Sequence, residues 1–147
     1  MTWQSATATA IATLILGACG ATPPTAPDAS ALDPAQPPPA GVPTEGHFVG
    51  VGHQGQGTAS LVVAEGRARL VFSGDFVVTQ TPGPYVYLNT ANDPKRGQPL
   101  RIAALKSSRG AQQYDFMVPA GVRYTYVLIW CDPFNVPVAE APIAPTP

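Results

Sequence analysis

Cys131 is the side chain of this 147-residue sequence with the most chemistry to offer, because it ends the apolar run YTYVLIWC and is one of only two cysteines. A cysteine acts as a redox group or a ligand through its thiolate, which a nearby cation or imidazole favours. His47 and His53 are the only imidazoles available. A free cysteine is also among the most buried residue types and often packs as a small hydrophobe. The residues alone leave both interpretations of Cys131 open.

A cofactor version of the same site would pair Cys131 with His53 as ligands of haem or of a metal ion. No C-x-x-C-H motif is present, so haem could not be attached covalently in the c-type manner. Two histidines also leave a metal site short of ligands. The pattern therefore specifies no cofactor, and the more ordinary interpretation of His53 is a polar loop residue between two glycines.

Cys19 ends a short apolar segment at the N-terminus. This segment, from about residue 8 to 18, is too short to span a bilayer and is typical of the apolar region of a secretory signal. The quartet Leu16-Gly17-Ala18-Cys19 resembles the lipobox of bacterial lipoproteins. That resemblance implies cleavage after residue 18 and lipidation of Cys19, and two or three acyl chains anchor stably to a membrane. Because the basic residues usual before such a segment are missing, a plain secretory signal cut elsewhere is the alternative.

These features predict an exported protein of the cell envelope. The residue after the lipobox cysteine is Gly20 rather than Asp, which fits the periplasmic side of the outer membrane in a Gram-negative bacterium. If Cys19 carries lipid, Cys131 has no disulfide partner within the chain.

The composition argues against several classes of function. A formal net charge of −1 with 12% charged residues favours neither a nucleic-acid partner nor an acidic substrate. No G-x-S-x-G motif occurs, and GHQGQG is a turn signal with no helix after it to cradle a phosphate. With two histidines in the whole chain, we expect no enzyme.

A proline-rich segment separates the N-terminal apolar segment from the rest of the chain. Residues 20–45 hold eight prolines and six alanines among 26 residues, with hardly a bulky apolar side chain. Such a segment predicts a disordered tether from 19 to 45, which would reach up to ~80 Å at about 3.1 Å per residue. We expect a signal peptide over 1–18, a folded domain over 46–141 and a disordered tail over 142–147.

The folded part reads as short strands separated by Gly- and Pro-rich turns. Eight to nine such strands predict an antiparallel β-sandwich, with a small β-barrel as the alternative. Glu65-Gly66 predicts a tight hairpin in which Gly66 takes a positive φ. In YTYVLIWC the alternation places Thr125, Val127, Ile129 and Cys131 on one face and Tyr124, Tyr126, Leu128 and Trp130 on the other. Both faces are apolar, so we expect this strand to be central and covered on each side.

Several residues and short motifs occur in an order that is typical of one family. They are, along the chain, Gly46, Phe48, His53, Gly57, Asp75-Phe76, Gly83-Pro84, Leu105-Lys106, Gly110, Tyr114, Val127, Ile129, Trp130, Cys131, Phe134 and Val136. In this order and spacing, from Gly46 to about Ile143, the sequence resembles the DM13 domain. The family usually has Asp after Gly-Pro, where this chain has Tyr85.

The resemblance implies a β-sandwich related to cytochrome-binding DOMON-type domains. It also implies a role in electron transfer through the family's cysteine, either as a bare thiol or as a ligand of a prosthetic group. We therefore predict a redox or electron-transfer accessory with Cys131 as the active residue, His53 and Trp130 as its neighbours, and a redox or protein partner in the envelope. The alternative is a non-catalytic binding or structural module in which Cys131 is a buried core residue.

Overall fold

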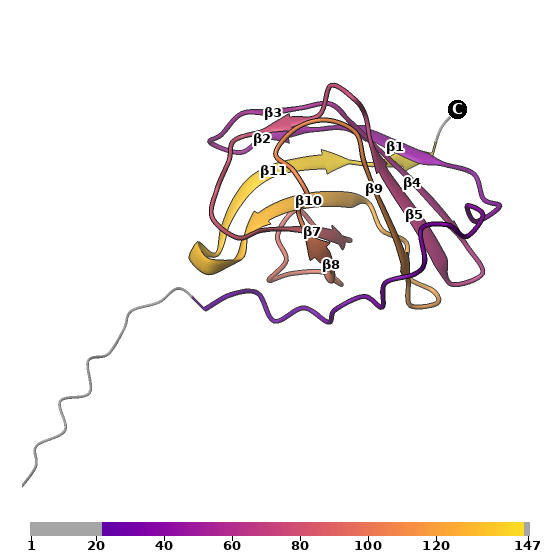
Figure 1. Ribbon diagram of the computed structural model, residues 1–147. Helices are drawn as coiled ribbons and strands as arrows, with labels where there is room; N and C mark the ends of the chain where they lie inside the picture. Colours follow the sequence, from indigo (N-terminus) through magenta and orange to yellow (C-terminus); the bar gives the residue numbers. More distant parts are fainter. Residues whose placement is uncertain (1–21, 146–147) are drawn as a thin grey trace, which may run out of the picture.

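The computed structural model describes residues 22–145 (Figure 1). These residues form twelve β-strands and one single-turn 3-10 helix, η1 (Asp132–Phe134). The strands are β1 (Thr44–His47), β2 (Val49–Gly50), β3 (Gly55–Gln56), β4 (Thr58–Ala64), β5 (Arg67–Phe72), β6 (Val77–Val78), β7 (Pro84–Asn89), β8 (Leu100–Ala104), β9 (Gln112–Met117), β10 (Tyr126–Cys131), β11 (Val136–Pro142) and β12 (Ala144–Pro145). The predicted signal peptide over 1–18 and Cys19 lie outside the described residues. Between residues 22 and 145, no helix is long and apolar enough to cross a bilayer.

Two five-stranded sheets face each other in Figure 1. Sheet I has the order β12-β1-β4-β5-β9, sheet II has the order β2-β11-β10-β7-β8, and β3 pairs with β6 separately. Every pairing between named strands is antiparallel. The edge strands β8 and β9 do not pair with each other, so the two sheets stay open on that side. The predicted sandwich is confirmed, and the barrel alternative is wrong. The structure has twelve strands where eight to nine were expected, because four of the twelve are only two residues long.

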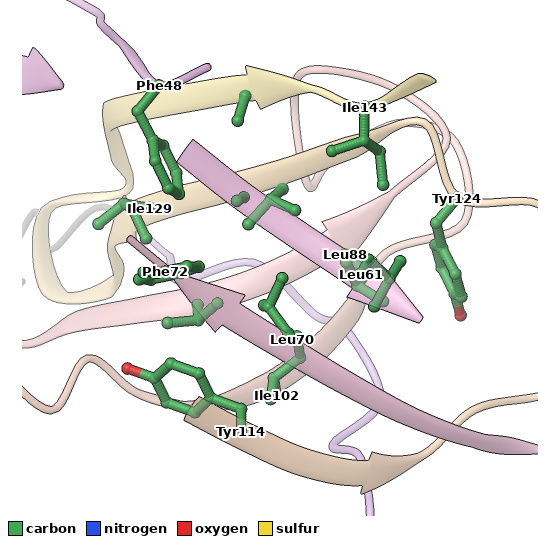
Figure 2. Packing of buried hydrophobic residues seen from close by; sticks show 14 of the residues in the cluster. Phe48, Leu61, Leu70, Phe72, Leu88, Ile102, Tyr114, Tyr124, Ile129 and Ile143 are labelled. Carbon is green, nitrogen blue, oxygen red and sulfur yellow. The ribbon is translucent and has the colours of Figure 1, made fainter. Parts of the chain in front are cut away.

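The hydrophobic core lies between the sheets (Figure 2). Leu61 and Leu70 point in from sheet I and Ile129 from sheet II, and all three are at most 3% exposed. Burying one such aliphatic side chain contributes about 1.5–3 kcal/mol, so this layer is the main source of stability. The ring of Phe72 packs against that of Phe76 at a centroid distance of 4.7 Å, within a larger aromatic cluster.

The predicted hairpin joins β4 to β5. Ala64 and Arg67 are paired, which leaves Glu65 and Gly66 as a two-residue loop. Their φ angles are +54° and +74°, and positive φ at both positions is what a type I′ turn requires. The turn fixes the register that directs Leu61 and Leu70 to the same face.

Strand β10 is the third of five strands in sheet II, and both of its faces are covered. Val127, Ile129 and Cys131 belong to the core between the sheets. Leu128 and Trp130 point the other way and form a second buried cluster on the outer face of sheet II. The prediction of a central strand covered on both sides is confirmed. The placement of Tyr124 on the outer face is wrong: Tyr124 lies in the core between the sheets, because β10 begins only at Tyr126 and the strand alternation does not extend back to it.

Residues 22–37, which we call the belt, wrap around the open side of the sandwich. In Figure 1 the belt is the indigo segment that runs from the outer side of sheet II towards sheet I. Four backbone hydrogen bonds with N–O distances of 2.7–2.9 Å hold it, two to β8 and two to β9. The donors and acceptors are Ala29 N to Arg101 O, Arg101 N to Pro27 O, Leu32 N to Asp115 O, and Met117 N to Ser30 O. The belt therefore pairs backbone groups that two edge strands would otherwise leave open.

Three arginines fasten the belt further. Arg101 Nη1 lies 3.2 Å from Asp28 Oδ1. Arg69 Nη2 donates to the carbonyl oxygen of Gln36 at 2.8 Å, and Arg67 Nη2 donates to that of Pro37 at 3.1 Å. Guanidinium groups carry several donors in a planar array, so they can hold a chain that has few side chains of its own to bury.

The belt corrects the predicted disordered tether. Ordering extends back to residue 22 because the backbone of a proline-rich segment can pair with sheet edges, a contact that its composition does not reveal. The predicted disordered tail over 142–147 also differs from the structure, since β11 runs to Pro142 and β12 pairs with β1.

Candidate functional site

The Cys131 side chain points into the core from the last residue of β10. It is 1% exposed, and its S–H donates to the carbonyl oxygen of Pro82 at an S–O distance of 3.0 Å. Its neighbours across the strands are Pro84 of β7 and Val136 of β11. Among the described residues, Cys131 is the free cysteine.

Only a thin layer of chain separates this thiol from solvent. Pro82 and Gly83, which lead into β7, are exposed although the sulfur bonded to Pro82 is buried. A second bond holds this segment, from Asp132 N to the carbonyl oxygen of Gly83 at 3.3 Å. We call residues 81–84 the cover. The buried hydroxyl of Thr81, the first residue of the cover, has no hydrogen-bond partner.

Gly83 adopts a backbone conformation that few other residues tolerate. Its φ is +58°, and a Cβ at this position would lie 2.8 Å from Cγ of Pro133. The cover therefore packs directly on the turn that follows Cys131, and its shape depends on a residue without a side chain.

The carboxylate of Asp132, the residue after Cys131, anchors a buried polar network. Tyr87 Oη donates to Asp132 Oδ1 at 2.7 Å, and Arg101 Nε donates to Asp132 Oδ2 at 2.8 Å. Burial raises the pKa of the Tyr87 phenol, and the hydrogen bond to the carboxylate raises it further. Burial disfavours the charged guanidinium, but hydrogen bonds to Asp28 and Asp132 still raise the pKa of Arg101 above its ordinary value. Because Arg101 also binds Asp28, the network connects the turn after Cys131 to the belt.

Trp130 does not lie beside the thiol. Adjacent residues of a strand point to opposite faces, so its indole lies in the outer cluster with Tyr87 and Leu128. Its Nε1–H donates to Asn135 Oδ1 at 3.1 Å, and Lys95 Nζ lies 6.0 Å from the ring centroid. Trp130 and Cys131 are adjacent in sequence, but their side chains lie on opposite faces of sheet II.

His53 is exposed in the turn between β2 and β3. In residues 22–145, no hydrogen bond or ion pair joins it to Cys131, and its neighbour Gln54 instead exchanges hydrogen bonds with Thr79. His47 contacts the hydroxyl of Thr58 through Nδ1 at 3.2 Å. The structure thus brings neither imidazole into contact with the thiol.

The described part of the chain holds no cluster of three or more His, Cys, Asp or Glu side chains suited to a metal ion. Within the part of the chain that the structure describes, no such cluster includes Cys131 or His53. The residues around the thiol are instead a carbonyl oxygen, prolines and the packed core.

Sequence reasoning missed Tyr87, Arg101 and Asp28. Tyr87 reads as an ordinary strand residue, and Arg101 is 31 positions from the carboxylate that it binds. The one available signal was Asp132, because a carboxylate directly after an apolar strand must find donors if it is buried.

The comparisons with known proteins gave one match. The family model described as "Electron transfer DM13" matches residues 47–143. No curated protein and no solved structure matches the chain. The matched residues begin at the last residue of β1 and stop just before β12, so they cover sheet II, the strands β4, β5 and β9 of sheet I, and none of the belt.

Proposed function

Because the chain belongs to the DM13 family, described by its role in electron transfer, we propose that it is a membrane-anchored redox accessory of the cell envelope acting through Cys131. The observation that carries this proposal is the position of the thiol, buried under two exposed residues at one end of the sandwich. A thiol held in this way is protected from bulk oxidants while the cover is closed. It becomes reactive when the short cover opens.

The reaction we propose is exchange with a disulfide of a partner protein. The Cys131 thiol loses its proton to solvent, and its sulfur forms a bond to one sulfur of the partner's disulfide. The other partner sulfur leaves as a thiolate with the electron pair of the broken S–S bond, and the product is a mixed disulfide between Cys131 and the partner. Release of the fully reduced partner then requires a second thiol, from a small-molecule or protein thiol of the envelope, to attack the Cys131 sulfur; Cys131 and that thiol together supply the two electrons. Opening of the cover breaks the S–H bond to Pro82 and frees the sulfur for this attack.

The sequence supports the proposed location. The Leu16-Gly17-Ala18-Cys19 quartet would place a lipid anchor on Cys19, three residues before the described part of the chain. We propose the periplasmic side of the outer membrane as its site in a Gram-negative bacterium. Mass spectrometry of protein extracted from membranes should show an acylated Cys19, and an unmodified soluble chain would refute the anchor.

The redox role is tested by treating the folded protein with a small disulfide such as oxidised glutathione. We expect a mixed disulfide on Cys131, formed at a rate that stays constant through low concentrations of urea, because local opening of the cover exposes little surface. Cys131→Ser is the control and should form no adduct, provided that Cys19 is acylated, or replaced by serine, in both proteins. A rate that tracks global unfolding at every urea concentration would show that the thiol is a packed core residue.

The burial of Cys131 specifically favours a second function. At 1% exposure the thiol matches an ordinary core position, and the domain would then be a non-catalytic module that binds a protein or ligand in the envelope. In that case cells that carry Cys131→Ala should behave like the wild type. The redox proposal instead requires that they behave like cells without the protein.

A further inference from the structure

We infer that the start of the belt and the loop over residues 90–99 form a surface that contacts the membrane, with Lys95 and Arg96 against anionic lipid headgroups. This inference rests on the proposed lipidation of Cys19 and adds the orientation of the domain on the bilayer. It departs from the expectation of a domain held far out on a long tether.

The belt begins next to the basic loop. Residues 22–25 line one open hollow together with Pro94, Lys95, Pro99 and Asn135. Ala26 then packs against the cluster of Tyr87, Leu128 and Trp130 on the outer face of sheet II. The lipid anchor therefore approaches the domain at this face.

The chain between anchor and domain is short. From Cys19 to Thr22 there are three residue steps, which span at most about 11 Å when fully extended. Electrostatic attraction to a charged surface extends about 8–10 Å at physiological ionic strength. The loop beside Thr22 is thus within reach of headgroup charge whenever the acyl chains are inserted.

The belt is held too firmly to act as a spacer. It is fixed by backbone hydrogen bonds to β8 and β9 and by the ion pair of Arg101 with Asp28. These bonds begin at Pro27, so the belt from there onward cannot extend away from the domain unless they break and the sheet edges lose their partners. Only the residues before Pro27 could extend, and Ala26 would first have to leave the cluster on the outer face of sheet II.

The loop presents its cations outward. Lys95 is exposed, and the side chain of Arg96 is 70% exposed. Asn89 orders the loop from inside by donating to the carbonyl oxygens of Asp93 and Arg96. The acids nearby are Asp93, whose Oδ2 lies 3.6 Å from Arg96 Nε, and Glu140, which lines a neighbouring hollow with Lys95. Each cation near an anionic membrane surface raises the binding constant roughly fivefold. Two cations alone would bind weakly, but the lipid anchor already holds the loop close to the surface.

The test measures protection of the loop from trypsin. The acylated full-length protein is reconstituted into vesicles of phosphatidylethanolamine with phosphatidylglycerol, and into vesicles of phosphatidylcholine alone. Cleavage after Lys95 and Arg96 is compared with cleavage after Arg109, an exposed residue of the loop between β8 and β9. The Cys19→Ser variant cannot be acylated and stays in solution. It gives the reference value for the ratio of cleavage at residues 95 and 96 to cleavage at Arg109.

We expect cleavage at residues 95 and 96, relative to Arg109, to fall at least tenfold on the anionic vesicles and less on the neutral ones. A ratio equal to that in solution, for protein shown by mass spectrometry to be acylated, would overturn the inference while leaving the anchor intact. Equal protection on both vesicle types would overturn the contact with anionic headgroups. An unacylated chain is instead a failure of the proposed anchor, and the mass spectrum distinguishes it.

Discussion

Replacing Gly83 by alanine should make Cys131 react faster in the folded protein. Gly83 has a φ of +58°, and alanine in this left-handed conformation costs about 1–2 kcal/mol. The new Cβ would also lie 2.8 Å from Cγ of Pro133, in a ring that cannot move aside easily. This strain is present when the cover is closed and relieved when it opens. The opening equilibrium should therefore shift by at least 1–2 kcal/mol, or about 5–30-fold.

The assay follows alkylation of Cys131 by iodoacetamide in native buffer, alongside urea unfolding of the same variant. Gly121→Ala is the matched control, because Gly121 has a φ of +78° and a Cβ there would meet nothing within 4 Å. The control should lose similar global stability through backbone strain but leave the alkylation rate of Cys131 near that of the wild type. Equal alkylation rates in Gly83→Ala and Gly121→Ala would refute the idea that the cover controls access to the thiol.

Three further predictions concern stability, each measured by urea unfolding. Asp132→Ala should cost about 3–5 kcal/mol because it leaves the buried groups of its network unpaired, and a cost below about 1 kcal/mol would contradict that network. Burial raises the pKa of the Tyr114 phenol from about 10 to about 12. The folded state therefore favours the protonated phenol, and about 2–3 kcal/mol of the free energy of unfolding, present in full below pH 10, is lost as the pH rises through 12. Tyr114→Phe should flatten that loss, and an unchanged slope would assign it to other groups. Leu70→Ala, in the core, should cost about 2–5 kcal/mol, whereas the exposed neighbour Val71→Ala should cost under about 1 kcal/mol; similar costs would mean that the register of β5 is wrong.

Much of the fold follows from local patterns. Alternation along YTYVLIWC assigned Val127, Ile129 and Cys131 to the core face, because side chains in a strand have a period of two. Glu65-Gly66 gave the register of the β4–β5 hairpin, because a two-residue loop permits few turn types. The family was also recognised from the order of its short motifs, and the matched range of 47–143 agrees with the predicted range of the resemblance.

The candidate site was predicted only in part. The sequence identified Cys131 as a strand-end residue and left its burial as one of two interpretations; in the structure the side chain is 1% exposed. It also grouped His53 and Trp130 with the thiol. The structure places the indole on the opposite face of β10 and the imidazole in an exposed turn. Nearness along a chain, or in a list of reactive residue types, does not fix nearness in space.

The sequence by itself determined the all-β class and most of the residues that face the core, because these depend on periodicity and on turns a few residues long. It also determined the family, through the order and spacing of its short motifs. Only the tertiary structure decided that Pro82 and Gly83 cover the thiol and that Asp132 joins Tyr87 to Arg101. It alone also decided that a proline-rich segment is a belt rather than a tether. The physical reason is that these contacts join residues 30 or more positions apart, through backbone edges and guanidinium groups that leave no periodic signal in the sequence.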